Sequence, residues 1–434
     1  MSKHTSPLRF SLHFLLLIAI TFSKLFLYVD SRTYRGDIKV LKDLKNGLDP
    51  RSIAPGSCLS SWDFSVDPCD HLFSDRFTCG FRCDRVVFGS ARVTEITLDS
   101  VGYSGSLAST TWNLPYLQTL DISDNSFSGS VPDSLSKLIR LQRLGLSRNS
   151  FSGEIPTSIG SLPRLEELCL DSNRFQGPIP SSFVKLINLQ RLEIQQNNIS
   201  GEFPYLGSLK NLNFIDASDN KISGEIQSST LPKSLVELSI RTNHLQGNLP
   251  DNIGDIEFLQ VLDLSHNMLS GPVSSVLFNH PSLQQLTLSY NNFTTLLQVP
   301  GDNININMGL TSKLIALDLS HNQLRGFLPA FMTTMPKLSA LSLEYNEFTG
   351  MIPSQYALKV AAPGANTSPF ERLLLGGNYL FGLIPGPLMG MKPGSANVSL
   401  VDNCLYMCPE TFFFCRGGDQ KSVVDCKSFG TVIP

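Results

Sequence analysis

Residues 141–156 read LQRLGLSRNSFSGEIP, and residues 165–180 read LEELCLDSNRFQGPIP. The two stretches are offset by 24 residues and share three leucines followed by Asn, Phe, Gly, Ile and Pro at the same spacing. The Leu-x-Leu alternation indicates a short strand with one buried face, and the Gly-x-Ile-Pro tail indicates a turn. A single unit of this kind cannot bury its apolar face, so we expect stability to come from stacked units.

The Asn of this pattern recurs along most of the chain. It is found at Asn125, Asn149, Asn173, Asn197, Asn220, Asn243, Asn267, Asn291, Asn322, Asn346, Asn378 and Asn403. The steps are 23 to 25 residues, apart from two of 31 and 32, and a unit without the Asn begins at Val93. A fixed period of this length predicts a solenoid. We count about 13 units over residues 93–403, and we expect the Asn side chains to bond backbone groups of neighbouring turns.

This repeat resembles that of the plant-specific extracellular leucine-rich repeats. The resemblance implies an α/β solenoid, a curved right-handed superhelix with a parallel β-sheet on its concave face. The family includes ectodomains of receptor-like kinases, receptor-like proteins and polygalacturonase-inhibiting proteins. Membership would imply a peptide or protein ligand on the concave face and no cofactor.

The N-terminal residues 1–31 have the pattern of a secretory signal peptide. Basic Lys3 and Arg9 precede an apolar run over residues 12–29, so we expect the mature chain to begin near Arg32. An uncleaved signal anchor is the alternative, and no other stretch of the sequence is long and apolar enough to span a bilayer. The formal net charge of −3, about −5 without the signal peptide, argues against nucleic acid as a partner.

The cysteines fall into two clusters of four and a single Cys169. The clusters are Cys58, Cys69, Cys79 and Cys83, and Cys404, Cys408, Cys415 and Cys426. Two such clusters predict disulfide-stapled caps, over residues 32–92 and 404–434, in an oxidising compartment. Each cluster allows three pairings, among which the sequence does not choose. A zinc site is the weaker alternative, because His71 is the only histidine nearby.

The N-terminal cap begins with a predicted helix over residues 37–48, which Pro50 ends. Its order of features resembles the family's usual cap, although the family has one close cysteine pair and this chain has four cysteines. Residues 35–37 spell Arg-Gly-Asp, an integrin-binding tripeptide that also arises by chance. Three consecutive phenylalanines, residues 412–414, are expected to cover the open end of the last repeat.

The positions beside the buried leucines should face outward on the concave sheet, where they suggest two candidate ligand-binding patches. The first is polar and mixed in charge, and it consists of Arg143, Arg148, Glu167, Asp171, Arg191, Glu193, Gln195 and Gln196. The second is a row on four successive units, His266, Tyr290, His321 and Tyr345, suited to stacking on sugars or anchoring a partner. The alternative for both is an ordinary solvated face. Cys169 should point to the same face.

Four sequons make N-glycosylation an expectation in a secreted protein. They are at Asn198, Asn292, Asn366 and Asn397. The two longer steps between repeats correspond to insertions at residues 294–312 and 355–368, and the second has the composition of a loop.

The sequence contains no Gly-x-Ser-x-Gly elbow, phosphate loop, His-Glu-x-x-His motif or kinase domain, so we expect no enzymatic activity. The leading hypothesis is a secreted or cell-surface recognition protein, in the extracellular space, the cell wall or at the outer face of the plasma membrane. It would act in signalling or defence as a kinase-less receptor-like component beside a membrane receptor-like kinase. The alternatives are an inhibitor of a wall-degrading glycosidase and a structural wall protein.

Overall fold

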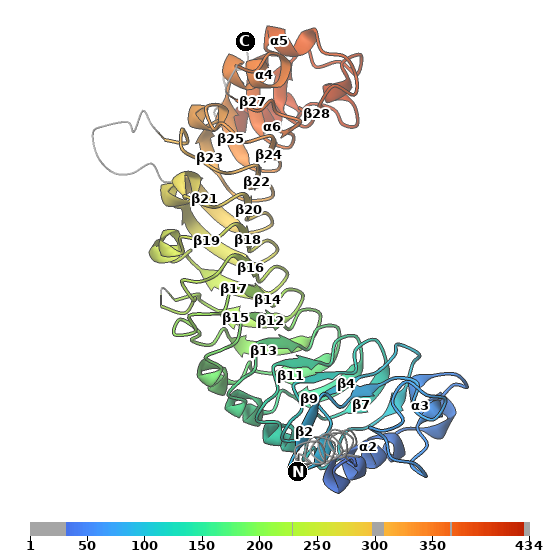
Figure 1. Ribbon diagram of the computed structural model, residues 1–434. Helices are drawn as coiled ribbons and strands as arrows, with labels where there is room; N and C mark the ends of the chain where they lie inside the picture. Colours follow the sequence, from blue (N-terminus) through green and yellow to red (C-terminus); the bar gives the residue numbers. More distant parts are fainter. Residues whose placement is uncertain (1–31, 228, 297–307, 365–366, 429–434) are drawn as a thin grey trace, which may run out of the picture.

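The computed structural model describes residues 32–227, 229–296, 308–364 and 367–428, which form an arc of stacked coils (Figure 1). The predicted signal peptide, residues 1–31, and the sequon at Asn366 lie outside the described residues. The prediction of a leucine-rich-repeat solenoid with a long parallel sheet and disulfides near both ends is confirmed.

One long sheet lines the inner side of the arc. Its parallel strands are β4 (Glu95–Thr97), β6 (Thr119–Asp121), β8 (Arg143–Gly145), β10 (Glu167–Cys169), β12 (Arg191–Glu193), β14 (Phe214–Asp216), β16 (Glu237–Ser239), β18 (Val261–Asp263), β20 (Gln285–Thr287), β22 (Ala316–Asp318), β24 (Ala340–Ser342), β26 (Arg372–Leu374) and β28 (Asn397–Ser399). β1 (Phe81–Arg82) pairs antiparallel with β4 at the N-terminal edge. The middle residue of each strand is buried, as Leu-x-Leu predicts, so the flanking residues face outward.

A second row of parallel strands follows the inner sheet. It consists of a nine-stranded sheet, β5 (Ser104–Gly105), β7 (Ser126–Gly129), β9 (Ser150–Glu154), β11 (Arg174–Gly177), β13 (Asn198–Glu202), β15 (Lys221–Gly224), β17 (His244–Gly247), β19 (Met268–Val273) and β21 (Asn292–Leu296), and a four-stranded one, β23 (Arg325–Phe327), β25 (Glu347–Gly350), β27 (Tyr379–Leu383) and β29 (Cys404–Tyr406). The sequence predicted only a turn in this part of each unit.

Short helices form the outer side of the arc (Figure 1). They are the 3-10 helices η2 (Asp133–Lys137), η3 (Thr157–Ser161), η4 (Ser181–Lys185), η5 (Asp251–Asp255), η6 (Ser275–Asn279) and η7 (Ala330–Thr333), and the α-helices α4 (Ser354–Ala361) and α5 (Gly386–Met389). The first half of the second insertion, expected to be a loop, is therefore part of the helix α4. None of the described helices is long and apolar enough to cross a membrane.

The repeated Asn side chains hold neighbouring coils together. Asn173 shows the pattern: its Oδ1 accepts from the Phe151 amide at 2.9 Å, and its Nδ2 donates to the carbonyls of Leu146 at 2.9 Å and Leu170 at 3.2 Å. The same bonds recur from coil to coil, as at Asn378 with the Phe348 amide. The predicted Asn ladder is present, and it satisfies backbone groups that the bends would otherwise leave unpaired.

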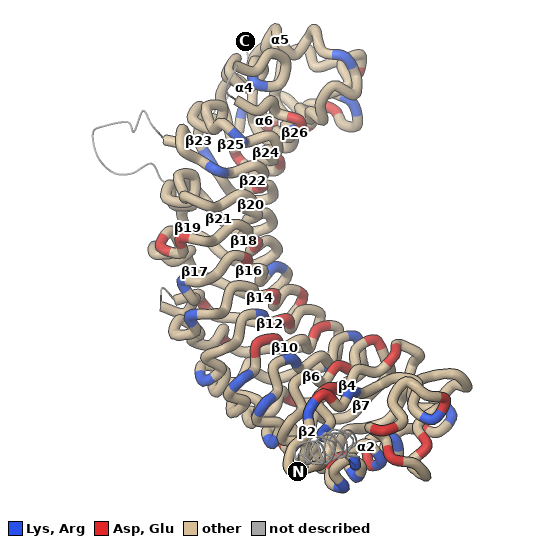
Figure 2. Tube along the Cα trace, in the orientation of Figure 1, with Lys and Arg blue, Asp and Glu red and all other residues tan. Residues whose placement is uncertain are grey.

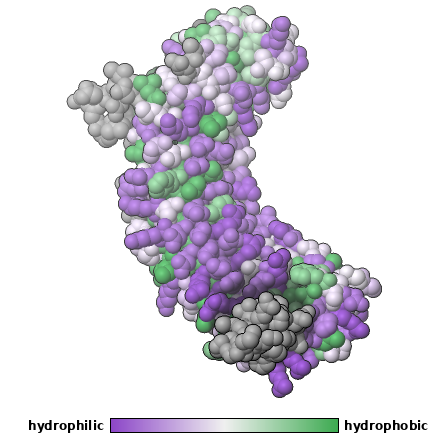
Figure 3. Space-filling model, viewed as in Figure 1, coloured by the Kyte–Doolittle hydropathy of each residue, from purple (hydrophilic) through white to green (hydrophobic). Residues whose placement is uncertain are grey.

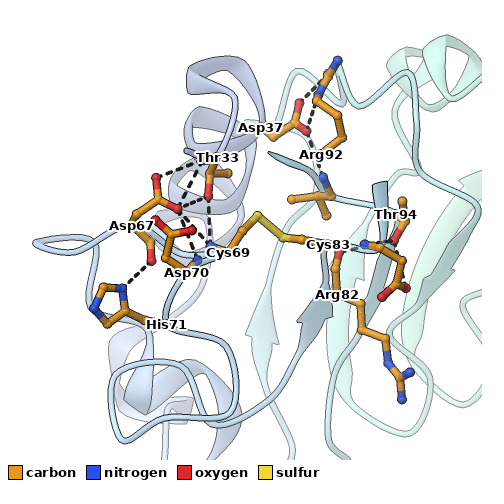
Figure 4. Close-up of a disulfide and its surroundings, with 12 residues drawn as sticks. Thr33, Asp37, Asp67, Cys69, Asp70, His71, Arg82, Cys83, Arg92 and Thr94 are labelled. Carbon is orange, nitrogen blue, oxygen red and sulfur yellow. Dashed lines mark hydrogen bonds and ion pairs between the residues drawn. A yellow bond between two sulfur atoms is a disulfide. The ribbon is translucent and has the colours of Figure 1, made fainter. Parts of the chain in front are cut away.

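The N-terminal end is held by two disulfides and a buried ion pair, and Figure 4 shows Cys69–Cys83 together with the ion pair of Asp37 and Arg92. Its elements are α2 (Arg35–Asn46), η1 (Pro50–Ser52), α3 (Cys58–Ser61), β2 (Arg85–Val87) and β3 (Ser90–Arg92), so the first helix begins two residues earlier than predicted. The disulfides are Cys58–Cys79 and Cys69–Cys83. Asp37 accepts two bonds from the Arg92 guanidinium, at 2.8 and 2.9 Å, and one from the Val93 amide. Because Asp37 is fully buried, the Arg-Gly-Asp tripeptide is not available to a partner.

The C-terminal end closes the last coil. Cys404–Cys426 encloses Cys408–Cys415 along the chain, beside η8 (Phe413–Cys415) and α6 (Val423–Ser428). Phe414 is buried and its carbonyl accepts a hydrogen bond from the Leu400 amide, so this residue covers the open end as expected.

Candidate ligand-binding surface

The first predicted patch is a network of ion pairs across β8, β10 and their neighbours. Arg143 contacts the carboxylates of Asp121, at 3.3 Å, and Glu167, each on an adjacent strand. Arg148 donates to the Asp124 carboxylate at 2.7 Å. Each of these arginines is thus shared among carboxylates of neighbouring coils, which leaves the network with little free positive charge. Asp121 and Asp124 belong to it, although the sequence did not single them out.

The ion pair of Arg148 with Asp124 also affects their titration. The guanidinium lowers the pKa of Asp124 and the carboxylate raises the pKa of Arg148, because each favours the charged form of the other. Asp171, expected to contact a ligand, is only 4% exposed, and it accepts a hydrogen bond from Ser147. Its Oδ2 lies 3.9 Å from Arg148. Asp171 therefore helps to orient Arg148, and its own carboxylate is covered.

The rest of the first patch continues onto β12. Arg191 pairs with Glu193 on its own strand, and its guanidinium lies 3.6 Å from the centre of the Phe214 ring. Gln196 accepts a hydrogen bond from the Ser172 hydroxyl at 2.7 Å. The Oε1 of Gln195 is a buried atom without a hydrogen-bond partner in the structure. The structure thus brings the eight predicted residues together on neighbouring coils, with Asp171 buried beneath the others.

Cys169 lies at the floor of a shallow hollow in this patch. The hollow is also lined by Asp121, Arg143, Arg148 and Glu193. Cys169 is a free thiol with 5% of its surface exposed. Burial, with a contribution from Glu193, raises its pKa to about 12, so the nucleophilic thiolate is suppressed at neutral pH.

The second predicted patch is a stacked column of rings. The ring centres of His266 and Tyr290 are 4.1 Å apart, those of Tyr290 and His321 3.9 Å, and those of His321 and Tyr345 4.3 Å, with planes within 18° of parallel. We call these four residues the ring ladder. The faces of its two inner rings are occupied by their neighbours, which leaves the ring edges for a ligand.

A backbone turn that the sequence did not predict builds the ring ladder. Each of its residues precedes a ladder Asn and has a left-handed backbone, for example φ 55° at Tyr290. That conformation is uncommon for large side chains, and here it recurs at the same point of successive coils. In the next coil the position is Gly377, where an added Cβ would lie 2.5 Å from the Tyr345 ring. Glycine there leaves room for the last ring.

Three of the four sequons can be placed. Asn198 begins β13 and Asn292 begins β21, both in the second row of strands, while Asn397 begins β28 of the inner sheet. All three side chains are exposed. Among the described residues no group of three or more His, Cys, Asp or Glu side chains is arranged to hold a metal ion.

The repeat and its parallel sheet define a leucine-rich-repeat protein, and comparison with known proteins gives the same class. Residues 100–358 match the family described as leucine-rich repeat region, and the chain belongs to that family. Among curated proteins, it is 34% identical to receptor-like protein 35 of Arabidopsis thaliana over 160 residues, which are 36% of this chain and 16% of that protein. It is 33% identical to receptor-like protein 7 of the same plant over 125 residues, 28% of this chain and 12% of that protein. The matches thus span less than a fifth of these relatives.

Solved structures of plant receptors have a similar fold. The ectodomain of the Arabidopsis thaliana receptor kinase GASSHO1/SCHENGEN3, in complex with CASPARIAN STRIP INTEGRITY FACTOR 2, gives a TM-score of 0.62 at 29% identity and covers 75% of this chain and 40% of that one. The ectodomain of the Arabidopsis receptor kinase HAESA, in complex with an N-terminally extended IDA peptide hormone, gives a TM-score of 0.61 at 29% identity. The match covers 85% of this chain and 61% of that one.

Proposed function

We propose that this protein is a receptor-like recognition protein that binds a peptide or protein along its inner sheet and works with a separate membrane receptor-like kinase. The observation that carries the proposal is the uninterrupted inner sheet, whose outward positions hold an ion-pair network at one end and the ring ladder at the other. Similarity to receptor ectodomains solved with peptide hormones supports it. An extracellular or cell-surface location goes with this role.

The exposed tyrosines of the inner face also support recognition of another chain. Seen from the side of the arc in Figure 3, the surface is mostly hydrophilic, with apolar residues in separate patches. On the ring ladder, Tyr290 is 45% and Tyr345 48% exposed, which suits amphipathic anchors that contact a partner and keep a hydrogen-bonding hydroxyl. Stacking against neighbouring rings holds these side chains in place, so little ordering entropy is lost on binding.

A matched pair of tyrosine variants tests the proposal. The purified chain, as wild type, Tyr290→Ala or Tyr205→Ala, is used to capture partners from extracellular fluid of the source tissue, and the captured peptides and proteins are quantified by mass spectrometry. Tyr205 follows β13, off the inner sheet, and is similarly exposed at 52%. We expect Tyr290→Ala to reduce recovery of a specific ligand about tenfold or more, while Tyr205→Ala leaves it unchanged.

The captured partners decide among the functions. A peptide together with a membrane receptor-like kinase supports the receptor proposal. Capture of a wall glycosidase that the chain then inhibits would favour the inhibitor alternative, and retention of wall polysaccharide alone would favour the structural one. Equal recovery with wild type, Tyr290→Ala and Tyr205→Ala would contradict recognition by the inner sheet.

A further inference from the structure

The inner sheet carries a second column of side chains, parallel to the ring ladder. Its register places Asp216 of β14 beside Ser239 of β16, Ser239 beside Asp263 of β18, and Asp263 beside Thr287 of β20. Thr287 then pairs with Asp318 of β22, and Asp318 with Ser342 of β24. A carboxylate therefore occupies this column on every second strand, with a hydroxyl residue between, and we call it the Asp/hydroxyl column.

The three carboxylates of the Asp/hydroxyl column are held in one orientation. In each case a serine two residues further along donates its amide and its hydroxyl to Oδ1 of the aspartate. The pairs are Asp216 with Ser218, at 3.0 and 2.6 Å, Asp263 with Ser265, at 3.0 and 2.6 Å, and Asp318 with Ser320, at 2.9 and 2.7 Å. All six bonds go to Oδ1, so Oδ2 of each aspartate remains for a cationic partner.

The surface around this column lacks compensating positive charge. Between β14 and Tyr345 the outward positions hold one arginine, Arg241, whose guanidinium lies 3.2 Å from Asp219. Acidic residues follow the inner curve past β14, β18 and β22 in Figure 2. Burial raises the pKa of Glu344, as does Asp318, even though Ser399 and Arg372 act in the opposite direction. Cations brought by a ligand would relieve this repulsion.

The spacing of the carboxylates matches one turn of a polyproline II helix. Strands lie about 4.8 Å apart in a sheet, so every second strand gives a repeat of about 9.6 Å. One three-residue turn of polyproline II spans about 9.3 Å and returns the side chain to the same face. Side chains of a β-type extended peptide alternate between two faces, so its every third residue would point away from the sheet. A peptide in the polyproline II conformation lying across the strands therefore presents every third side chain to a carboxylate.

We propose that the inner sheet face from β14 to β24 binds a peptide in the polyproline II conformation, in which Lys or Arg recurs at every third residue and pairs with Asp216, Asp263 and Asp318. This inference rests on the proposed function and specifies its ligand. The hydroxyls of Ser239 and Thr287 face the backbone between the cations. The ring ladder, three residues further along the coils, contacts the aliphatic stems of the basic side chains.

Three synthetic peptides of identical composition test the spacing. Each carries three lysines among neutral polar residues, placed at every second, every third or every fourth position, and binding to the full chain is measured by calorimetry in low salt. We expect the every-third peptide to bind about tenfold more tightly than the other two, since only it makes all three ion pairs. Its affinity should fall as salt is added.

A matched pair of double variants identifies the site. Asp263→Asn with Asp318→Asn removes two charges but keeps the Oδ1 acceptors for the serines, and we expect it to weaken the every-third peptide about tenfold. Glu202→Gln with Glu225→Gln removes two exposed charges off the inner sheet and should have no effect. Equal affinity for the three peptides, equal loss in both double variants, or no binding by any peptide would each overturn the cation pattern.

Capture of the native ligand with two variants distinguishes failure of this inference from failure of the proposed function. A captured ligand that is lost with Tyr290→Ala but retained with the Asp263 and Asp318 double variant would overturn the cation pattern and leave recognition by the inner sheet standing. A ligand retained by both variants would overturn both proposals.

Discussion

The Asn ladder should stabilise the solenoid unequally along its length, and two substitutions can measure this. Asn173 and Asn378 each accept one backbone N–H bond and donate to three carbonyls, with similar distances. Asn378 is fully buried, whereas Asn173 is partly exposed. Replacement by alanine leaves the same groups unpaired at both sites, but water can reach them only near Asn173.

The expected losses follow from the cost of an unpaired buried group, about 1–3 kcal/mol. We expect Asn173→Ala to cost about 1–2 kcal/mol and Asn378→Ala about 3 kcal/mol, because no solvent replaces the lost bonds of Asn378. Asn188→Ala, outside the ladder, removes a single exposed bond to the Pro163 carbonyl, which water can replace, and should cost about 0.5 kcal/mol or less. Hydrogen exchange of the backbone amides measures the loss of stability coil by coil, which global melting of a repeat protein does not. Equal protection of the amides around the three substituted sites would refute the reasoning.

Three further results are expected. Asp37→Asn should cost about 3–5 kcal/mol in thermal or denaturant unfolding, since it leaves the Arg92 charge buried without its partner; unchanged stability would disprove a structural role. Alkylation of Cys169 at pH 8 should be on the order of a thousandfold slower than that of an exposed thiol, and unfolding should restore the rate. Burial lowers the pKa of Lys359 to about 8 in the folded chain, from 10.5 when unfolded. Wild type should therefore gain about 2 kcal/mol over Lys359→Met as pH rises from 8 to 10.5, and parallel stability curves would contradict this.

The sequence predicted those features that depend on the repeat period alone. Leu-x-Leu and the Asn at steps of about 24 residues specify a strand and a bend in every coil, so stacking follows without further information. The second row of strands was missed because segments such as residues 150–154 have little apolar alternation, and their pairing partners exist only once coils stack.

The sequence also could not predict which distant residues pair with one another. The N-terminal disulfides interleave along the chain and the C-terminal ones are nested, although both clusters contain four cysteines. The ring ladder residues could be identified as a row, but not their stacking, because the left-handed turn before each Asn is rare for Tyr and His. The residues of the Asp/hydroxyl column could be read from the sequence. Only the strand register shows that its aspartates and hydroxyl residues lie side by side on successive strands.

The Asn ladder also has a mechanical consequence. Its inter-coil bonds join residues 21 to 35 positions apart, so each coil is tied only to its neighbours. Tension applied to the two ends would therefore detach one coil at a time. With a coil of 24 residues, each event would lengthen the chain by about 80 Å. The disulfides near the ends would act as stops, because they keep the terminal loops from extending.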